Sequence, residues 1–196
     1  MYIPDHFSWQ DKEEIFLFIE SYNFGQIVSY GPAGLNATHL PFLIEKQGEE
    51  ITLYGHFART NDHWQKINDQ QAMAIFQGPH AYVSPVWYET SGVPTWNYLA
   101  VHVYGEIELV EKNEALHDIV LGLSDKHEKH RQEPWIPDYG NNMLNAIVGF
   151  KMTATEIQAK QKLSQNKSDN DRSGIIRGLI EGGSENEMII ANWMSK

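Results

Sequence analysis

An alternation of apolar and polar side chains runs through the segment Tyr98-Leu-Ala-Val-His-Val-Tyr-Gly-Glu-Ile-Glu-Leu-Val110. Leucine, valine and isoleucine fall on one face, while tyrosine, histidine and glutamate fall on the other. This period of two residues predicts a long strand with one buried face. Gly105 falls on the apolar face, where it would suit a bulge or bend in a curved sheet.

Shorter runs of β-branched and aromatic residues surround this segment and predict further strands. They are Phe24–Tyr30, Asn36–Glu45, Ile51–Phe57, Met73–Phe76, Ala81–Val86 and Ala146–Ile157. The turn sequences Gly31-Pro-Ala-Gly34 and Lys46-Gln-Gly-Glu-Glu50 separate the first three runs. Connections of this length favour hairpins between neighbouring antiparallel strands.

Between the strands, apolar residues spaced three and four apart predict short helices. One spans Asp11–Tyr22, and its Glu14 stands at the spacing of a capping box with Asp11. A second begins at Asn61, a good N-cap residue. The other inward-facing residues and caps are Trp64 and Ile67 in the second helix, Leu116, Ile119, Val120 and Leu123 in a third, and Ser184 with Glu187 in the last of two helices that follow residue 169.

These elements predict a mainly β fold with peripheral helices, an α+β protein in the broad sense. Six or seven strands with hairpin connections favour an antiparallel, strongly curved sheet that closes into a barrel, with helices packed outside. We expect a single domain over residues 1–196, with C-terminal helices from about residue 169.

The amino-acid composition and net charge exclude several classes of function. The 196 residues include 15 Lys+Arg against 26 Asp+Glu, a net charge of −11, and no cysteine. Disulfides, thiol nucleophiles and thiolate metal sites are excluded. The start lacks the pattern of a signal peptide and no apolar run could span a membrane, so we expect a cytoplasmic protein. Any contact with DNA would be confined to residues 151–177, a segment with six basic residues and three acidic ones.

Several stretches crowd polar and aromatic residues onto predicted strand ends. They are Thr38-His-Leu-Pro41, Leu53-Tyr-Gly-His-Phe-Ala-Arg59 with Asn61 and Trp64, Gln77-Gly-Pro-His-Ala-Tyr82, Val93-Pro-Thr-Trp-Asn-Tyr98 and Lys162-Leu-Ser-Gln-Asn166. In this order they resemble the PaiB family, also described as FMN-binding negative transcriptional regulators. The resemblance runs over nearly the whole chain.

The resemblance implies a split β-barrel related to pyridoxamine-phosphate oxidases and flavin reductases. Such proteins are usually homodimers with FMN at the subunit interface, although FMN need not be retained on purification. It also implies negative regulation of sporulation and of protease production. Neither role follows from composition or spacing.

FMN requires donors for its phosphate, hydrogen bonds for the flavin edge and flat apolar groups for the ring. Arg59 ends a strand just before the helix predicted at Asn61, and a guanidinium beside a helix N-terminus favours an anion. We therefore expect Arg59 and Asn61 to hold the phosphate, with Ala58 supplying backbone. The alternative is an ordinary surface arginine beside a helix cap.

The remaining candidates come from the other motifs. Thr38, His39 and Leu40 lie on an irregular strand end and are expected to meet the pyrimidine edge of the flavin. His56, Trp96 and Tyr98 are candidate lining residues. Lys162, Ser164 and Gln165 follow a strand within the basic segment, which could reach across the dimer to the FMN phosphate or to an acid group of a second ligand. Each has a structural alternative: a rim histidine, a core or interface aromatic, a solvated lysine.

Three functional hypotheses remain at this point. The first is an FMN-binding regulator. The second is an FMN-dependent oxidoreductase or flavin reductase, for which the sequence dictates no catalytic residue. The third is haem held by the rim histidines. The pair His127 and His130 lacks the spacing of a zinc-protease motif, and we expect no metal site there.

Overall fold

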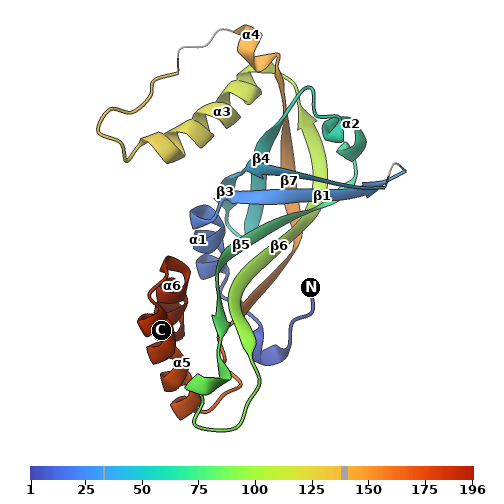
Figure 1. Ribbon diagram of the computed structural model, residues 1–196. Helices are drawn as coiled ribbons and strands as arrows, with labels where there is room; N and C mark the ends of the chain where they lie inside the picture. The colour runs from blue at the N-terminus through green and yellow to red at the C-terminus, as the bar shows by residue number, and fades with distance from the viewer. Residues whose placement is uncertain (33, 138–140) are drawn as a thin grey trace. The chain divides into compact units, whose positions relative to one another are not determined.

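The computed structural model describes residues 1–32, 34–137 and 141–196. Seven strands form one antiparallel sheet in the order β2-β1-β5-β6-β7-β4-β3 (Figure 1). The strands are β1 (Phe24–Gly31), β2 (Gly34–Pro41), β3 (Leu43–Gln47), β4 (Glu50–Ala58), β5 (Gln71–Val83), β6 (Thr95–Val110) and β7 (Ile147–Lys162). The helices are η1 (Asp5–Phe7), α1 (Lys12–Ser21), α2 (His63–Ile67), η2 (Pro85–Trp87), α3 (Asn113–Glu128), α4 (Asn141–Leu144), α5 (Asp169–Gly182) and α6 (Glu185–Met194).

The chain divides into two compact units, to which β5, β6 and β7 each contribute residues. Unit 1 comprises Met1–Phe18, Gln77–Val101 and Gln158–Lys196, and unit 2 comprises Ile19–Phe76 and His102–Ile157. Each unit has its own apolar core and is described separately below.

The sheet is not closed, contrary to the closed barrel expected from the strand pattern. Its edges are β2 and β3, and within the described residues no ladder joins them. Instead the chain passes from one edge to the other at Phe42. The Phe42 N–H donates to the Asn23 carbonyl at 2.8 Å, and the Asn23 amide donates back to the Phe42 carbonyl at 2.9 Å. Because Pro41 has no N–H and Phe42 pairs with Asn23, the predicted strand Asn36–Glu45 becomes two strands.

Other elements agree with the sequence pattern, with two further corrections. The runs Met73–Phe76 and Ala81–Val86 belong to one strand, β5. Helix α2 begins at His63 rather than at Asn61, with Asp62 as its N-cap, and the Asn61 side chain accepts the His63 N–H at 3.1 Å. The predicted β6 is confirmed, and a Cβ on its Gly105 would lie 2.3 Å from the Thr153 carbonyl oxygen.

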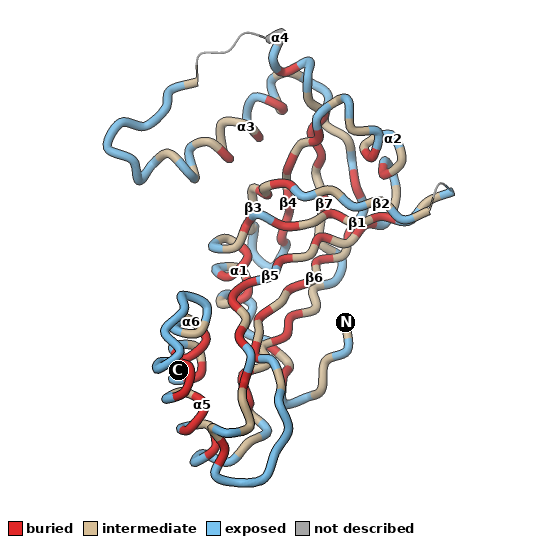
Figure 2. Tube along the Cα trace, in the orientation of Figure 1, coloured by how far each residue is buried: buried red, intermediate tan, exposed pale blue. Residues whose placement is uncertain are grey.

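Buried residues, red in Figure 2, line both units, and aromatic side chains are prominent among them. In unit 2, the buried Phe42 ring packs edge-on against Phe76 and Phe150, with centroids 5.0 and 5.9 Å away. In unit 1, the Trp9 ring packs against Phe18 and Trp193 at 5.2 and 5.5 Å. Such edge-to-face pairs stabilise a core beyond the area they bury.

Candidate functional site

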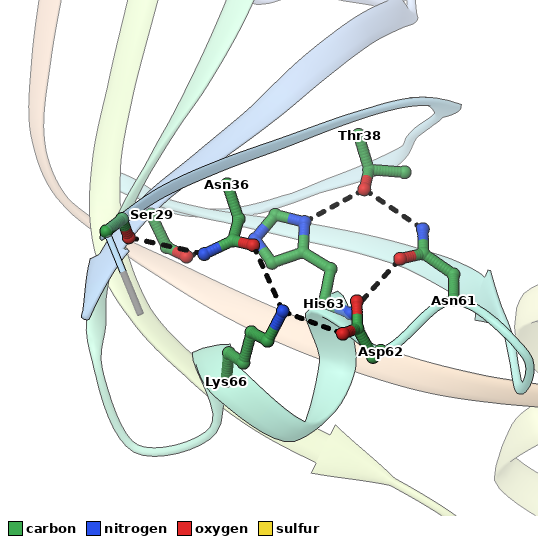
Figure 3. A network of polar contacts seen from close by, with 8 residues as sticks. Ser29, Asn36, Thr38, Asn61, Asp62, His63 and Lys66 are labelled. Carbon is green, nitrogen blue, oxygen red and sulfur yellow. Dashed lines mark hydrogen bonds and ion pairs between the residues drawn. The ribbon is translucent and has the colours of Figure 1, made fainter. Parts of the chain in front are cut away.

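Four side chains of unit 2 form a continuous chain of hydrogen bonds, here called the His63 network: Ser29, Thr38, Asn61 and His63 (Figure 3). The His63 ring lies 2.9 Å from the Ser29 hydroxyl through Nε2 and 2.8 Å from the Thr38 hydroxyl through Nδ1. Asn61 donates to the Thr38 hydroxyl oxygen at 3.1 Å. The network therefore ties β1 and β2 to the turn that opens α2.

His63 is buried, with 2% of its surface exposed. Burial is the main cause that lowers its pKa below the ordinary 6.5, and the nearby Lys66 ammonium adds to the effect while Asp62 opposes it. Lys66 itself pairs with Asp62 at 2.7 Å and reaches the Asn36 side chain at 3.5 Å. His63 is thus neutral at neutral pH, with one ring nitrogen donating and the other accepting.

Arg59 lies one residue beyond β4 in the same unit. Its Nε donates to the Asn145 carbonyl at 2.8 Å and Nη2 to the Ile147 carbonyl at 3.0 Å, while Nη1 is 3.4 Å from Glu111. The guanidinium also stacks over the Trp64 ring at 5.7 Å. Its side chain is 39% exposed. Arg59 is therefore held in a fixed orientation while part of its guanidinium faces solvent.

The other candidates of unit 2 point in different directions. His39 is exposed and stacks beside Phe24, with ring centroids 6.4 Å apart. Leu40, the next residue, turns inward and is 4% exposed. Ala58 is exposed, and its carbonyl accepts the Asn61 N–H at 2.9 Å. Strand alternation thus separates His39 from Thr38 and places them on opposite faces of β2.

His56 lies on β4 directly opposite Gly149 of β7. A Cβ on Gly149 would meet Leu116 and Ile119 of α3, so His56 occupies the sheet face that α3 covers. Its Nδ1 is buried with no hydrogen-bond partner among the described residues, and burial lowers its pKa below 6.5.

The candidates of unit 1 form a second group. Trp96 is 51% exposed, and its ring lies 5.6 Å from His80 and 6.1 Å from Tyr82. Tyr98 is half-buried, with the Lys160 ammonium 5.3 Å from its ring centroid. The result is a partly exposed aromatic cluster with a cation beside it.

The Lys162-Leu-Ser-Gln motif begins at the last residue of β7 and continues into the turn that follows. Lys162 donates to the Thr95 hydroxyl at 2.6 Å and to the Trp96 carbonyl at 2.5 Å. Burial is the main cause that lowers the pKa of Lys162, and the positive charges of Lys160 and Lys167 lower it further. Ser164 is buried, has a φ of 61° and donates to Asn97 at 3.0 Å. Gln165 accepts from the Leu163 N–H at 2.7 Å. Ser164 and Gln165 direct their side chains toward the protein itself.

Asn61 is thus hydrogen-bonded to both Thr38 and Ala58, and Arg59 follows Ala58 directly in the chain. Leu40 lies on the same face of β2 as Thr38 but is buried, while His39 and His56 face elsewhere. Sequence reasoning missed Ser29 and His63, which complete the network. A signal was available for Ser29, because a polar residue stands at a position of β1 that alternation places inward, after Gly25 and Ile27. His63 carries no such local signal.

Residues 1–156 match the model of a family described as "Putative FMN-binding domain". The chain belongs to this FMN-binding domain family. It is also 38% identical over 200 residues to "Protease synthase and sporulation protein PAI 2" of Bacillus subtilis, a match that covers 99% of this chain and 96% of the relative. This similarity identifies the chain as a PaiB homologue.

The fold of this chain is similar to that of two solved structures. The flavocytochrome Anf3 from Azotobacter vinelandii has a TM-score of 0.67 at 11% identity, over 88% of this chain and 78% of that one. An FAD and haem binding protein from Mycobacterium smegmatis has a TM-score of 0.65 at 13% identity, over 90% and 80% of the two chains. At these identities the likeness concerns the fold alone. Among the described residues, no helix is long and apolar enough to cross a membrane.

Proposed function

We propose that this chain is a cytoplasmic FMN-binding protein that acts as a negative regulator of protease production and sporulation. The observation that carries FMN binding is the donor set of unit 2, beside membership of the FMN-binding domain family. The regulatory role is supported by the Bacillus subtilis relative, whose name refers to protease synthase and sporulation.

The residues present fit the phosphate of FMN. A guanidinium has five N–H groups, and three of those of Arg59 have partners among the described residues, which leaves two for an anion. The carbonyls of Asn145 and Ile147 fix the orientation of the group, so little side-chain entropy is lost on binding. Thr38 and Asn61 add neutral donors for the ligand. Bound FMN would supply redox chemistry, while these residues hold and orient it.

We propose that the protein is a homodimer through the outer face of β1 and β2. Strand alternation directs Phe24, Val28 and Tyr30 of β1 and Leu35 and Ala37 of β2 toward this face. Tyr30 and Leu35 are paired in register and are 74% and 76% exposed. The polar pair Gln26 and His39 lies on the same face, next to Val28 and Ala37. An exposed face with several large apolar side chains is typical of protein–protein contact.

Regulation through an extended DNA contact finds little support in the basic segment. Of its six basic residues, Lys160 is buried and Lys151 is half-buried, Lys162 and Arg172 donate to backbone carbonyls, and Lys167 lies over the Tyr88 ring at 4.4 Å. Arg177 is the exposed one. We therefore propose that any effect on transcription depends on the flavin or on a protein partner, with DNA contact limited to a small patch.

A visible absorption spectrum tests the proposal. The freshly purified protein is measured before and after FMN is added and the excess removed. Retained flavin bands are the expected result, and Arg59→Ala is expected to weaken retention. A protein that stays colourless after reconstitution, while its circular dichroism shows that it is folded, would overturn FMN binding.

An FMN-dependent oxidoreductase is the second candidate, favoured by the exposed aromatic cluster of His80, Tyr82 and Trp96. Flat rings of this kind could receive a second planar substrate. Oxidation of NADH or NADPH faster than with free FMN would support it, and Trp96→Ala should then raise KM more than it lowers kcat. A rate equal to that of free FMN would exclude this reductase activity.

A further inference from the structure

We propose that His63 is held in its Nδ1–H tautomer by Ser29, and that the Thr38 hydroxyl consequently donates a hydrogen bond to an acceptor atom of bound FMN. The inference rests on the proposed FMN binding and names two positioning residues, Ser29 and His63, behind one ligand-contacting residue.

Ser29 decides the tautomer. It is 4% exposed, and within the described residues its hydroxyl has one partner, the Nε2 atom of His63 at 2.9 Å. A buried hydroxyl has a single proton, and it needs an acceptor for that proton. If Nε2 is unprotonated, Ser29 donates to it and both buried groups are satisfied. If Nε2 carries the proton, the Ser29 proton has no acceptor.

The His63 tautomer determines whether the Thr38 hydroxyl can donate a hydrogen bond to a ligand. Its hydroxyl oxygen already accepts from the Asn61 amide at 3.1 Å. When the His63 Nδ1–H also donates to this oxygen, at 2.8 Å, both lone pairs are occupied. Within the part of the chain that the structure describes, the Thr38 proton then has no acceptor. Because Thr38 is half-buried rather than sealed, this proton is available to a ligand that approaches from outside.

The opposite tautomer has a different result. With the proton on Nε2, the Thr38 hydroxyl would donate to Nδ1 and have nothing to offer a ligand. It would also leave a buried donor on Ser29 unsatisfied, which is the more costly arrangement. Burial is the main cause that lowers the pKa of His63, so the ring is neutral and carries its single proton on either Nδ1 or Nε2.

The tautomer can be measured without FMN. Two-bond proton–nitrogen correlation spectra of the 15N-histidine-labelled protein distinguish the protonated from the unprotonated ring nitrogen, and His63→Gln assigns the signal among nine histidines. We expect the proton on Nδ1. A spectrum with the proton on Nε2 would overturn the inference, whatever the protein binds.

The consequence for the ligand is measured by fluorescence titration with FMN. Thr38→Val removes the hydroxyl at nearly constant size and should raise the Kd about tenfold, as for one lost hydrogen bond. Thr38→Ser keeps the hydroxyl and should stay within about twofold of the unsubstituted protein. Ser29→Ala should raise the Kd by less than Thr38→Val and produce both His63 tautomers in the spectrum.

Wild-type affinity in Thr38→Val would overturn the inference while leaving FMN binding intact. Absence of FMN binding in the unsubstituted protein would instead overturn the proposed function and, with it, the contact to Thr38. If Thr38→Val does not fold, the spectra of the unsubstituted protein and of Ser29→Ala still decide the assignment.

Discussion

Asp171 is a carboxylate held within unit 1 with only 2% of its surface exposed. It accepts from the backbone N–H groups of Glu89 and Thr90 at 2.8 and 3.2 Å and from the Thr90 hydroxyl at 2.8 Å. The hydrogen bond from the Thr90 side chain is the largest cause that lowers the pKa of Asp171 below 3.8. The ionised carboxylate of Asp171 therefore holds the loop that follows η2 against α5.

We expect Asp171→Asn to unfold at a lower temperature than the unsubstituted protein at pH 7. Since the folded-state pKa is depressed, the stabilisation is present above the unfolded value of 3.8 and is lost as pH falls through the folded pKa. The gap between the two melting temperatures should consequently close in strong acid. A gap that is constant from neutral pH to strong acid would contradict the assignment.

His56 predicts a pH dependence of the same sign in a higher pH range. Burial lowers its folded-state pKa below 6.5, so the unfolded chain takes up a proton that the folded chain resists. Stability should fall as pH drops below 6.5, and His56→Gln should flatten the fall. Urea unfolding at about pH 7 and about pH 5.5 measures the difference, on either side of the ordinary histidine pKa. The same fall in both proteins would show that His56 titrates normally.

At the scale of elements, α5 packs against η2 through glycine. A Cβ on Gly178 would lie 2.3 Å from the Trp87 ring, and one on Gly174 would lie 2.0 Å from the Trp87 carbonyl oxygen. A helix normally gains about 1 kcal/mol when glycine becomes alanine. Here the contact with Trp87 leaves no room for the added methyl group.

Gly178→Ala should therefore lower the free energy of unfolding by about 1–3 kcal/mol, the usual cost of overpacking. Ser173→Ala is the matched control, because Ser173 is exposed on the same helix and its change adds no contact. Chemical denaturation compares the two. Equal stability of the variants would mean that Trp87 moves aside at little cost.

Local sequence patterns predict a helix or strand well where one face of the element is buried and the other is exposed to solvent. The alternation over Tyr98–Val110 and the capping box of Ser184 and Glu187 both hold in the structure. Pro41 indicates an irregular strand end, but the complete break at Phe42 could not be predicted, because it also depends on Asn23, nineteen residues earlier in the chain. The His63 network likewise joins three separate segments, and nothing near His63 in the sequence indicates Ser29 as its partner.

The candidate site was predicted in part for the same reason. Arg59 and Asn61 were recognised from their position beside a helix start, a local feature. The carbonyls that orient Arg59 come from residues 145 and 147, far along the chain. Whether these residues contact FMN remains a prediction, as it does for the aromatic and lysine candidates of unit 1.

At the scale of the whole molecule, the outer face of β1 and β2 predicts the oligomeric state. Sedimentation velocity should give twice the chain mass of 22.5 kDa. Tyr30→Glu with Leu35→Glu should shift the protein to the monomer by placing charges in the apolar contact. Val86→Glu is the control, because Val86 is 83% exposed but lies in unit 1. A dimer that survives the double substitution would place the contact elsewhere.

The most direct test of the central claim, that unit 2 holds FMN through its phosphate, compares FMN with riboflavin, which has the same ring and no phosphate. Fluorescence titration should give a Kd for FMN at least about tenfold lower, corresponding to about 1.4 kcal/mol from the phosphate contacts. In Arg59→Ala the two ligands should bind almost equally. Equal affinity for FMN and riboflavin in the unsubstituted protein, or an undiminished preference in Arg59→Ala, would contradict the account.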